Sequence, residues 1–408
     1  MKKIYALSVR LVPVILLMTA LFTSLNTYAQ SEKAADASTK VVPGTTETVS
    51  AIMERAETAI PDTLRKKIKK KRPDRTILPQ NPFSPVAATY PETDQSVITP
   101  MNPSNDQPQT IGLSFNGFTS SSSSGPFPPD DMGAIGPTQY IVAVNGIIRS
   151  FNASTGVADG VLNVHPDVFF ASVMTPVAGN FTSDPRIRYD RFSGRWLMLI
   201  IDVPNGGASA NRVLLAVSNS STITGGTTWT FSQFTGQAST FIDYPTVGMD
   251  INGVYIGGNM FSLAGSYLRT NGYVINRANL MSGGLYTVYT FLSLASGSGA
   301  GPYTPQGVDN FDITATQGYF VGVDNASFGT LAIRRISTPA GVPTISAHIP
   351  VTVNSTAYPN TVAHLGNTGG TNGNLDAIDD RLYAAMIRNG HLWTAHTIYV
   401  NASGVAGT

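Results

Sequence analysis

The sequence predicts an all-β fold, a β-propeller of six or seven blades, for residues 111–408. Three observations lead to this prediction: short apolar runs of strand length fill the region, helical periodicity is nearly absent from it, and one small motif recurs along it. Many short strands at close spacing are typical of a sandwich, a barrel or a propeller. Repetition favours the propeller, because that fold repeats one sheet around an axis.

The apolar runs have the length and composition of β-strands. They are rich in β-branched and aromatic residues, and most are bounded by Gly, Asn, Asp or Ser, which favour turns. The clearest runs are residues 140–144, 195–201, 213–217, 253–257 and 318–323. No obvious closing strand follows the last strand-like run, at residues 397–400. We therefore expect a ring that is incomplete at its C-terminus, or one that residues 111–115 close.

The recurring motif is an aspartate, often beside a proline, that stands just before a pair of strands. Five copies are centred on Asp131, Asp184, Asp243, Asp309 and Asp379, at successive spacings of 53, 59, 66 and 70 residues. Familiar propeller blades have about 40 to 50 residues each. The spacing therefore predicts blades with long loops.

Residues 1–29 have the three parts of a cleavable secretory signal. Lys2, Lys3 and Arg10 are basic, residues 11–22 are mostly apolar, and the small residue Ala29 precedes a cleavage point. The apolar run is too short for a membrane-spanning helix, which needs about 20 apolar residues. We expect a secreted product, extracellular or periplasmic, with no membrane span.

Residues 30–110 are predicted to be a disordered linker. The segment carries a dense basic run at residues 65–72 and is rich in proline and polar residues from 73 to 108. A solvated linker is the favoured interpretation of such a run. No aromatic residues alternate with the basic ones, as a nucleic-acid stacking platform would require, so we expect no nucleic-acid partner.

The folded region is acidic and free of lysine. After Arg75 the chain has 12 arginines, 18 acidic residues and a net charge of −6, and its last glutamate is Glu92. The chain has no cysteine, which excludes disulfides, thiolate metal sites and thiol nucleophiles. An exported chain without disulfides fits a bacterial secretory route.

Three segments resemble signatures of a family of secreted bacterial propellers. They are PPDDMGAIGP at residues 128–137, RYDRFSGRW at 188–196, and Asp379-Asp380-Arg381 continuing to NGHLWTAHT at 389–397. The resemblance is to sialidase-like propellers of the BNR or Asp-box type, mostly of unestablished function. It implies a propeller fold, and TITGGTTW at 222–229 is similar to an Asp-box with Thr224 in the place of the aspartate.

Classical sialidase chemistry is not expected in this chain. The resemblance implies three arginines that bind a carboxylate, together with a tyrosine nucleophile activated by a glutamate. Arginines are present, but residues 111–408 contain no glutamate. Other hydrolytic chemistry would depend on aspartates and arginines at the mouth of the propeller, for which the candidates are Asp184, Arg186, Asp243, Asp309 and Arg381.

The repeated aspartates have a simpler interpretation, in which each one caps a turn by accepting backbone N–H groups. Occurrence in every blade favours this structural role, whereas a catalytic role would single out one or two blades. The sequence therefore favours a binding module over an enzyme. Its candidate binding residues are Asp130, Asp131, Tyr244, Trp393 and His396.

The sequence predicts no metal site and no cofactor. Binding of Ca²⁺ by the aspartates is a weaker alternative. Residues 376–380 form only a loose carboxylate cluster, and no EF-hand pattern occurs. His391 and His396 would lie on opposite faces of one strand, which argues against zinc. The sequence does not indicate an oligomeric state.

Three functions follow from these observations. The leading hypothesis is a secreted propeller that binds a glycan or an extracellular protein. The alternatives are a glycan-directed hydrolase or lyase that uses Asp and Arg groups at the mouth, and a structural segment of a larger cell-surface protein.

Overall fold

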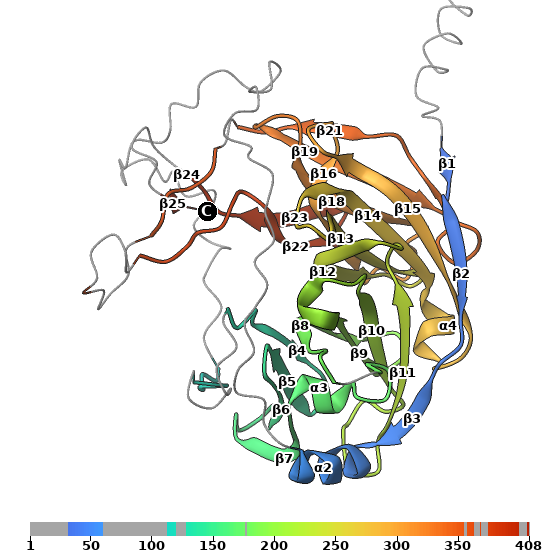
Figure 1. Ribbon diagram of the computed structural model, residues 1–408, viewed down its shortest axis with the longest axis vertical. Coiled ribbons are helices and arrows are strands. Elements are labelled where there is room, and N and C mark those ends of the chain that lie inside the picture. Colours follow the sequence, from blue (N-terminus) through green and yellow to red (C-terminus); the bar gives the residue numbers. More distant parts are fainter. Residues whose placement is uncertain are drawn as a thin grey trace, which may run out of the picture.

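The computed structural model describes residues 32–59, 112–119, 128–175, 178–354, 357–362, 368, 374–399 and 406–407. The predicted signal at 1–29 and the basic run at 65–72 lie outside this set. Strands make up most of the regular secondary structure of the described chain (Figure 1). None of its helices is long and apolar enough to cross a bilayer.

The strands form a five-bladed propeller, so the prediction of six or seven blades was wrong. Blade 1 is β4 (Met132–Ile135), β5 (Gln139–Val144), β6 (Ile147–Asn152) and β7 (Ala158–Val164). Blade 2 is β8 (Thr182–Asp190), β9 (Arg195–Asp202), β10 (Arg212–Ser218) and β11 (Thr228–Thr235). Blade 3 is β12 (Thr240–Met249), β13 (Gly253–Ser262), β14 (Tyr267–Asn276) and β15 (Tyr286–Ser296).

Blades 4 and 5 are less regular. Blade 4 is β16 (Pro302–Gly307), β18 (Gln317–Asp324) and β19 (Thr330–Ser337), and β19 pairs with both β20 (Thr344–Ile345) and β21 (Ile349–Thr352). Blade 5 is β17 (Asp309–Asn310), β22 (Leu382–Arg388) and β23 (His391–His396), and β17 runs parallel to β22. A separate pair is formed by β24 (Ile398–Tyr399) and β25 (Ala406–Gly407).

The strand predictions were confirmed. The predicted number of blades was too high because each blade contains more residues than expected. All five apolar runs fall within strands, namely β5, β9, β10, β13 and β18. Strands of up to 11 residues, such as β15, lengthen the blades. Short helices between strands lengthen the connections further: α3 (Pro166–Phe169), a 3₁₀ turn η4 (Pro204–Gly207) and α4 (Arg277–Met281).

An N-terminal segment, which we call the belt, crosses four blades in reverse order. It consists of β1 (Lys33–Ala34), β2 (Ala37–Val41), β3 (Thr45–Thr48) and α2 (Val49–Thr58). β1 pairs with β20 of blade 4, β2 with β15 of blade 3, and β3 with β11 of blade 2. Residues 30–110 were predicted to be a linker, whereas this part of them supplies outer strands to three blades.

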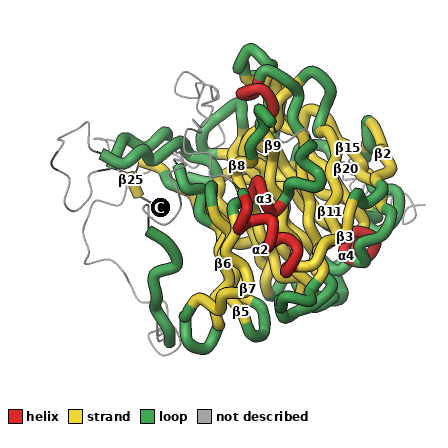
Figure 2. The backbone as a smooth tube through the Cα atoms, turned by 60° about the horizontal axis from the view of Figure 1, so that its bottom comes forward, coloured by secondary structure: helices red, strands yellow, loops and turns green. Residues whose placement is uncertain are grey.

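The belt runs down one side of the propeller in blue in Figure 1. At its lower end α2 packs against α3 and β7, where Figure 2 shows the two helices together beside blade 1. Arg55 of α2 donates to the carbonyl of Val168 at 2.9 Å and pairs with Glu47. Thr48 caps the helix by accepting from the N–H of Ala51. Polar contacts therefore fix the end of the belt.

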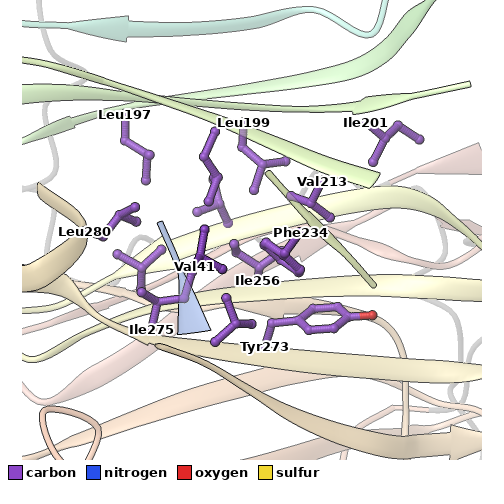
Figure 3. Close-up of a cluster of buried hydrophobic side chains, with 14 of the residues drawn as sticks. Val41, Leu197, Leu199, Ile201, Val213, Phe234, Ile256, Tyr273, Ile275 and Leu280 are labelled. Atoms are coloured by element: carbon purple, nitrogen blue, oxygen red, sulfur yellow. The ribbon is translucent and has the colours of Figure 1, made fainter. Parts of the chain in front are cut away.

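The largest core fills the space between blades 2 and 3, and the belt closes it. Figure 3 shows side chains of blade 2, among them Leu197, Leu199 and Val213, facing Ile256 and Ile275 of blade 3. Val41 of β2 is 5% exposed and packs into the same cluster, which also contains Leu280 of α4. The predicted linker thus contributes to the hydrophobic core, through Val41 here and through Val49 and Ile52 in the core beside blades 1 and 2.

Residues 112–119 do not close the ring with a strand. They contain no strand, and Phe115 packs instead on Tyr140 and Phe151 of blade 1, at ring-centroid distances of 6.0 and 5.2 Å. The expectation that residues 111–115 supply a closing strand was therefore wrong for the described part of that segment.

The belt can be tested by shortening one of its buried side chains. Val41→Ala removes two buried methyl groups from the core between blades 2 and 3, and we expect a loss of about 2 kcal/mol in the free energy of unfolding. The matched control is Val42→Ala, because the neighbouring Val42 is 74% exposed. Chemical denaturation measures both changes, and equal unfolding free energies for the two variants would contradict the packing of the belt.

Candidate functional site

The two ends of the propeller axis differ in chemistry. We call the end where the inner strands β8, β12 and β16 begin the front rim, and the end where they finish the rear rim. At the front rim each blade starts with a non-glycine residue in the left-handed region of backbone space. These residues are Asp130 (φ 49°), Asp184 (60°), Tyr244 (51°), Thr304 (47°) and Ile378 (63°). Such conformations are uncommon and persist only where the surroundings hold them.

A proline follows Asp184, Tyr244 and Thr304, and each proline interrupts the regular pairing of its inner strand. Pro185, Pro245 and Pro305 lie at β-bulges, where the pairing of the inner strand with its neighbour shifts register. Proline has no N–H to donate to the ladder, so a bulge is a position that tolerates it. The bulge frees the carbonyls of Pro245 and Pro305 to accept hydrogen bonds from the preceding blade.

The residue after each proline makes the link to the following blade. Arg186 Nε donates to the carbonyl of Pro245 at 2.5 Å, and Thr246 Oγ1 donates to that of Pro305 at 2.6 Å. In the same way, Gln306 Nε2 donates to the carbonyl of Leu382 at 2.8 Å. All three side chains are buried. Blades 2 to 5 are thus joined in sequence by one repeated contact, which we call the latch.

Buried asparagines add a second set of links between blades. Asn145 Oδ1 accepts from the N–H of Asp184 at 2.9 Å, and Asn211 exchanges two hydrogen bonds of 2.8 Å with the backbone of Ile242. Asn259 bonds both the N–H and the hydroxyl of Thr304, at 3.1 and 3.0 Å. An amide suits this role because it offers both a donor and an acceptor.

The carboxylates of Asp130 and Asp184 are connected through this network. Asn145 Nδ2 donates to Asp130 Oδ2 at 2.6 Å. The Asp184 carboxylate accepts from Ser183 Oγ at 2.6 Å and from the backbone N–H of Tyr244 at 3.2 Å. Asp184 therefore contacts blades 1, 2 and 3 at once, and both aspartates take part in holding the front rim.

Tyr244 is the centre of a cluster of charged and aromatic side chains. The guanidinium carbons of Arg186 and Arg381 lie 4.8 and 4.5 Å from the centroid of its ring, within cation–π range. Arg381 is bound in turn by both carboxylate oxygens of Asp379, at 2.6 and 2.7 Å. Arg381 also donates to the hydroxyl of Tyr303 at 3.1 Å, and complete burial raises the pKa of Tyr303 well above its ordinary value.

This cluster leaves polar groups available for a ligand. Within the described chain, the hydroxyl of Tyr244 and the two terminal nitrogens of Arg186 make no hydrogen bond. Tyr244 and Asp243 are only half-buried. The front rim thus presents the half-buried phenol of Tyr244, against whose ring the latch holds the Arg186 guanidinium.

The structure brings together some of the candidate residues predicted from the sequence and separates others. Asp184, Arg186, Asp243, Tyr244 and Arg381 lie at the front rim, with Asp130 joined to them through Asn145. Asp309 lies at the rear rim, where it accepts from Arg188 Nε at 2.9 Å and from the N–H of Met249 at 3.0 Å. Asp309 does not hold the position in blade 4 that Asp184 holds in blade 2, because Thr304 does.

The remaining candidates lie apart from the Tyr244 cluster. Asp131 is exposed and lines a cavity of about 570 Å³ between residues 113–118 and blade 1. Trp393 is 60% exposed on β23. His396 Nδ1 lies 2.7 Å from the carbonyl oxygen of Asp380, so the imidazole contacts the backbone that leads into β22 of blade 5. No group of three or more His, Asp or Glu side chains that could hold a metal ion occurs in the described chain.

Reasoning from the aspartates missed the asparagine links and the Tyr303–Arg381 contact. A different signal was present in the sequence: Pro185, Pro245 and Pro305 are spaced 60 residues apart. Counting prolines would have located the start of blade 4 at Thr304. It would also have singled out Arg186, Thr246 and Gln306 as equivalent residues.

Comparison with known protein families finds no match, and neither does comparison with curated proteins. Solved structures do match the chain. An exo-β-1,3-galactanase from Clostridium thermocellum is 12% identical with a TM-score of 0.35, and the match covers 68% of this chain and 64% of the galactanase. A Trypanosoma rangeli sialidase is 13% identical with a TM-score of 0.36, over 68% of this chain and 42% of the sialidase.

An endo-arabinanase from Bacillus licheniformis is 14% identical with a TM-score of 0.29, over 69% of this chain and 97% of the arabinanase. This chain spans less than two thirds of the length of the galactanase and the sialidase. At these identities no substrate and no residue role transfers from them to this chain.

The latch can be tested at Thr246, which is 2% exposed. Thr246→Val keeps the shape of the side chain but leaves the carbonyl of Pro305 without its donor and the N–H of Gly257 without its acceptor. Buried groups left unsatisfied in this way cost about 1–3 kcal/mol each, so we expect a loss of at least about 2 kcal/mol in the free energy of unfolding.

Thr287→Val is the matched control for this test. Thr287 lies on β15 and its hydroxyl makes no hydrogen bond within the described residues. Equilibrium denaturation should show little change for the control. A Thr246→Val variant as stable as the control would show that the latch contributes nothing to stability.

Proposed function

We propose that this chain is an exported propeller that binds a saccharide at the front rim. The observation that carries the proposal is the Tyr244 cluster, in which one half-buried phenol lies within cation–π range of two arginines and beside Asp243. A saccharide presents many hydroxyl groups, each both a donor and an acceptor. Arginine nitrogens donate to such groups and aspartate oxygens accept from them.

Rigidity supports recognition at this position. Arg186 is held by its bond to Pro245, Arg381 by Asp379, and Tyr244 by its own N–H bond to Asp184. A site whose side chains are already fixed loses less conformational entropy when a ligand binds. The front rim is therefore preorganised for a polar ligand.

Binding is favoured over hydrolysis because the best-placed carboxylates already have partners. Asp184 accepts from Ser183 and Tyr244, and Asp379 forms a two-pronged ion pair with Arg381. Carboxylates used in this way hold the blades together. Acid–base chemistry requires carboxyl groups that face the substrate with separated pKa values.

A glycan-directed hydrolase is the second candidate. The observation in its favour is that Asp130, Asp184 and Asp243 occur at the starts of three consecutive blades. A hydrolase would use two of these aspartates as acid and base on a saccharide bound at Tyr244. Turnover assays run beside binding assays separate the two functions.

The saccharide proposal predicts the effect of removing one hydroxyl. Tyr244→Phe keeps the ring and its cation–π contacts, so the fold should be retained, while the affinity for a glycan identified on an array should fall about tenfold. Tyr289→Phe on β15 is the matched control and should bind normally. Calorimetry measures both affinities, and assays with chromogenic glycosides measure turnover.

Two outcomes of these assays would overturn the binding function. If no glycan binds to the array, the front rim has another role. If a glycoside is hydrolysed and Asp130→Asn or Asp243→Asn abolishes turnover without loss of binding, the hydrolase is the correct assignment.

Export is a separate part of the proposal. It is supported by the basic, apolar and small-residue pattern of residues 1–29 and by the absence of cysteine. Expression of the full chain in a bacterium should yield a product outside the cytoplasm that begins at Gln30. N-terminal sequencing checks this, and a cytoplasmic product that retains Met1 would contradict it.

A further inference from the structure

A cavity of about 750 Å³ lies at the rear rim, at the opposite end of the inner strands from Tyr244. We call it the rear cavity. Three connections from different blades enclose it: the turn after β8, which contains Arg191, the loop at residues 310–317 between β17 and β18, and the turn at residues 388–390 between β22 and β23. Its volume is in the range of sites that hold small ligands.

Two arginines face this cavity without an ionic partner. Arg191 and Arg388 are exposed, and neither side chain forms an ion pair or a hydrogen bond with any residue that the structure describes. The guanidinium of Arg191 lies 4.8 Å from the centroid of the Phe311 ring. This cation–π contact orients Arg191 without using its N–H groups, so all of them can bind a ligand.

The cavity is electropositive, although it lies on the acidic part of the chain after Arg75. Its lining contains one acidic side chain, Asp312, and this carboxylate accepts from both the N–H and the hydroxyl of Thr314 at 2.8 Å. These hydrogen bonds lower the pKa of Asp312, which therefore stays charged. Two arginines against one aspartate give a positive cavity, whereas the chain after Arg75 carries a net charge of −6. A local excess of positive charge attracts anions.

The remaining lining suits a hydroxylated ligand. Gln317 Oε1 accepts from the hydroxyl of Tyr319 at 3.2 Å, which leaves the Gln317 amide N–H groups to donate elsewhere. Asn389 and Gly390 form the turn between β22 and β23, with φ values of 51° and 76°. Phe311 and Met386 add apolar surface, against which the C–H face of a sugar ring packs.

We propose that the rear cavity binds an anionic saccharide, a sugar that carries a carboxylate or a sulfate. Arg191 and Arg388 bind the anionic group, because a guanidinium makes paired, charge-assisted hydrogen bonds to such groups. Gln317 and Asn389 bind the sugar hydroxyls, and Phe311 lies under the ring. This site is independent of the front rim and does not require the Tyr244 cluster to bind anything.

Calorimetry on the exported chain tests the proposal with three disaccharides. The probes are a disaccharide that contains glucuronate, a sulfated disaccharide and a neutral disaccharide of the same linkage. We expect binding of at least one anionic probe, at least tenfold weaker binding of the neutral one, and an affinity that falls as salt rises from about 50 to 500 mM. The two anionic probes distinguish a carboxylate ligand from a sulfate ligand.

Matched variants assign the binding to the rear cavity. Arg191→Gln and Arg388→Gln should each weaken the anionic probe about tenfold or more, since each removes a charge-assisted contact. Arg149→Gln is the control, because the guanidinium of Arg149 on blade 1 lies 4.9 Å from the centroid of the Phe118 ring, a contact similar to that of Arg191 and Phe311. Tyr244→Phe should leave the affinity for the anionic probe unchanged.

Three results would overturn the proposal. They are no binding of either anionic probe, equal affinity for the neutral probe, and binding that survives both arginine variants but is lost in Tyr244→Phe. The last result would place the anionic saccharide at the front rim and would leave the proposed function intact. Because Arg191 and Arg388 are exposed, both variants should fold, which circular dichroism verifies.

Discussion

The rest of the structure depends on the latch at the front rim. In a propeller each blade is locally complete, so the ring is specified only by contacts between blades. Here Arg186, Thr246 and Gln306 each donate to a carbonyl of the following blade. The first two acceptors are the carbonyls of Pro245 and Pro305, which lie at β-bulges, and the third is the carbonyl of Leu382. The positive φ before each proline is a cost that these buried bonds offset. Stability and the geometry of the front rim therefore have the same origin.

The belt covers the outer edge strands of three blades, which would otherwise be exposed. Unpaired edge strands offer free N–H and C=O groups to other chains. β1, β2 and β3 cover the edges of blades 4, 3 and 2, and α2 packs beside blade 1. One segment from outside the repeats therefore ties four blades together across large distances in sequence. The belt joins the blades at the outer edges of their sheets, whereas the latch joins them at the inner edges, so both sets of contacts stabilise the ring.

Local features of the fold could be predicted from the sequence, and long-range ones could not. Strands such as β9 and β13 are apparent from composition and turn residues alone. The belt is not, because Thr39 and Thr46 gain a partner only after blades 2 and 3 have formed. The aspartate count failed at blade 4, because the latch is made by backbone carbonyls and needs no carboxylate. Thr304 stands directly before Pro305 at the front rim, whereas Asp309 accepts hydrogen bonds at the rear rim.

The two rims also show which residues of a repeat protein are free to acquire a function. Positions that every blade shares are constrained by architecture, so Asp184 and Asn259 are occupied by contacts between blades. The recognition that we propose rests instead on residues that depart from the repeat. At the front rim the proposed residue is Tyr244, where blade 4 has Thr304. At the rear rim the departure is Arg191, whose charge no residue of the described chain neutralises. Both proposed ligand sites therefore lie where the blades differ and not where their residues repeat.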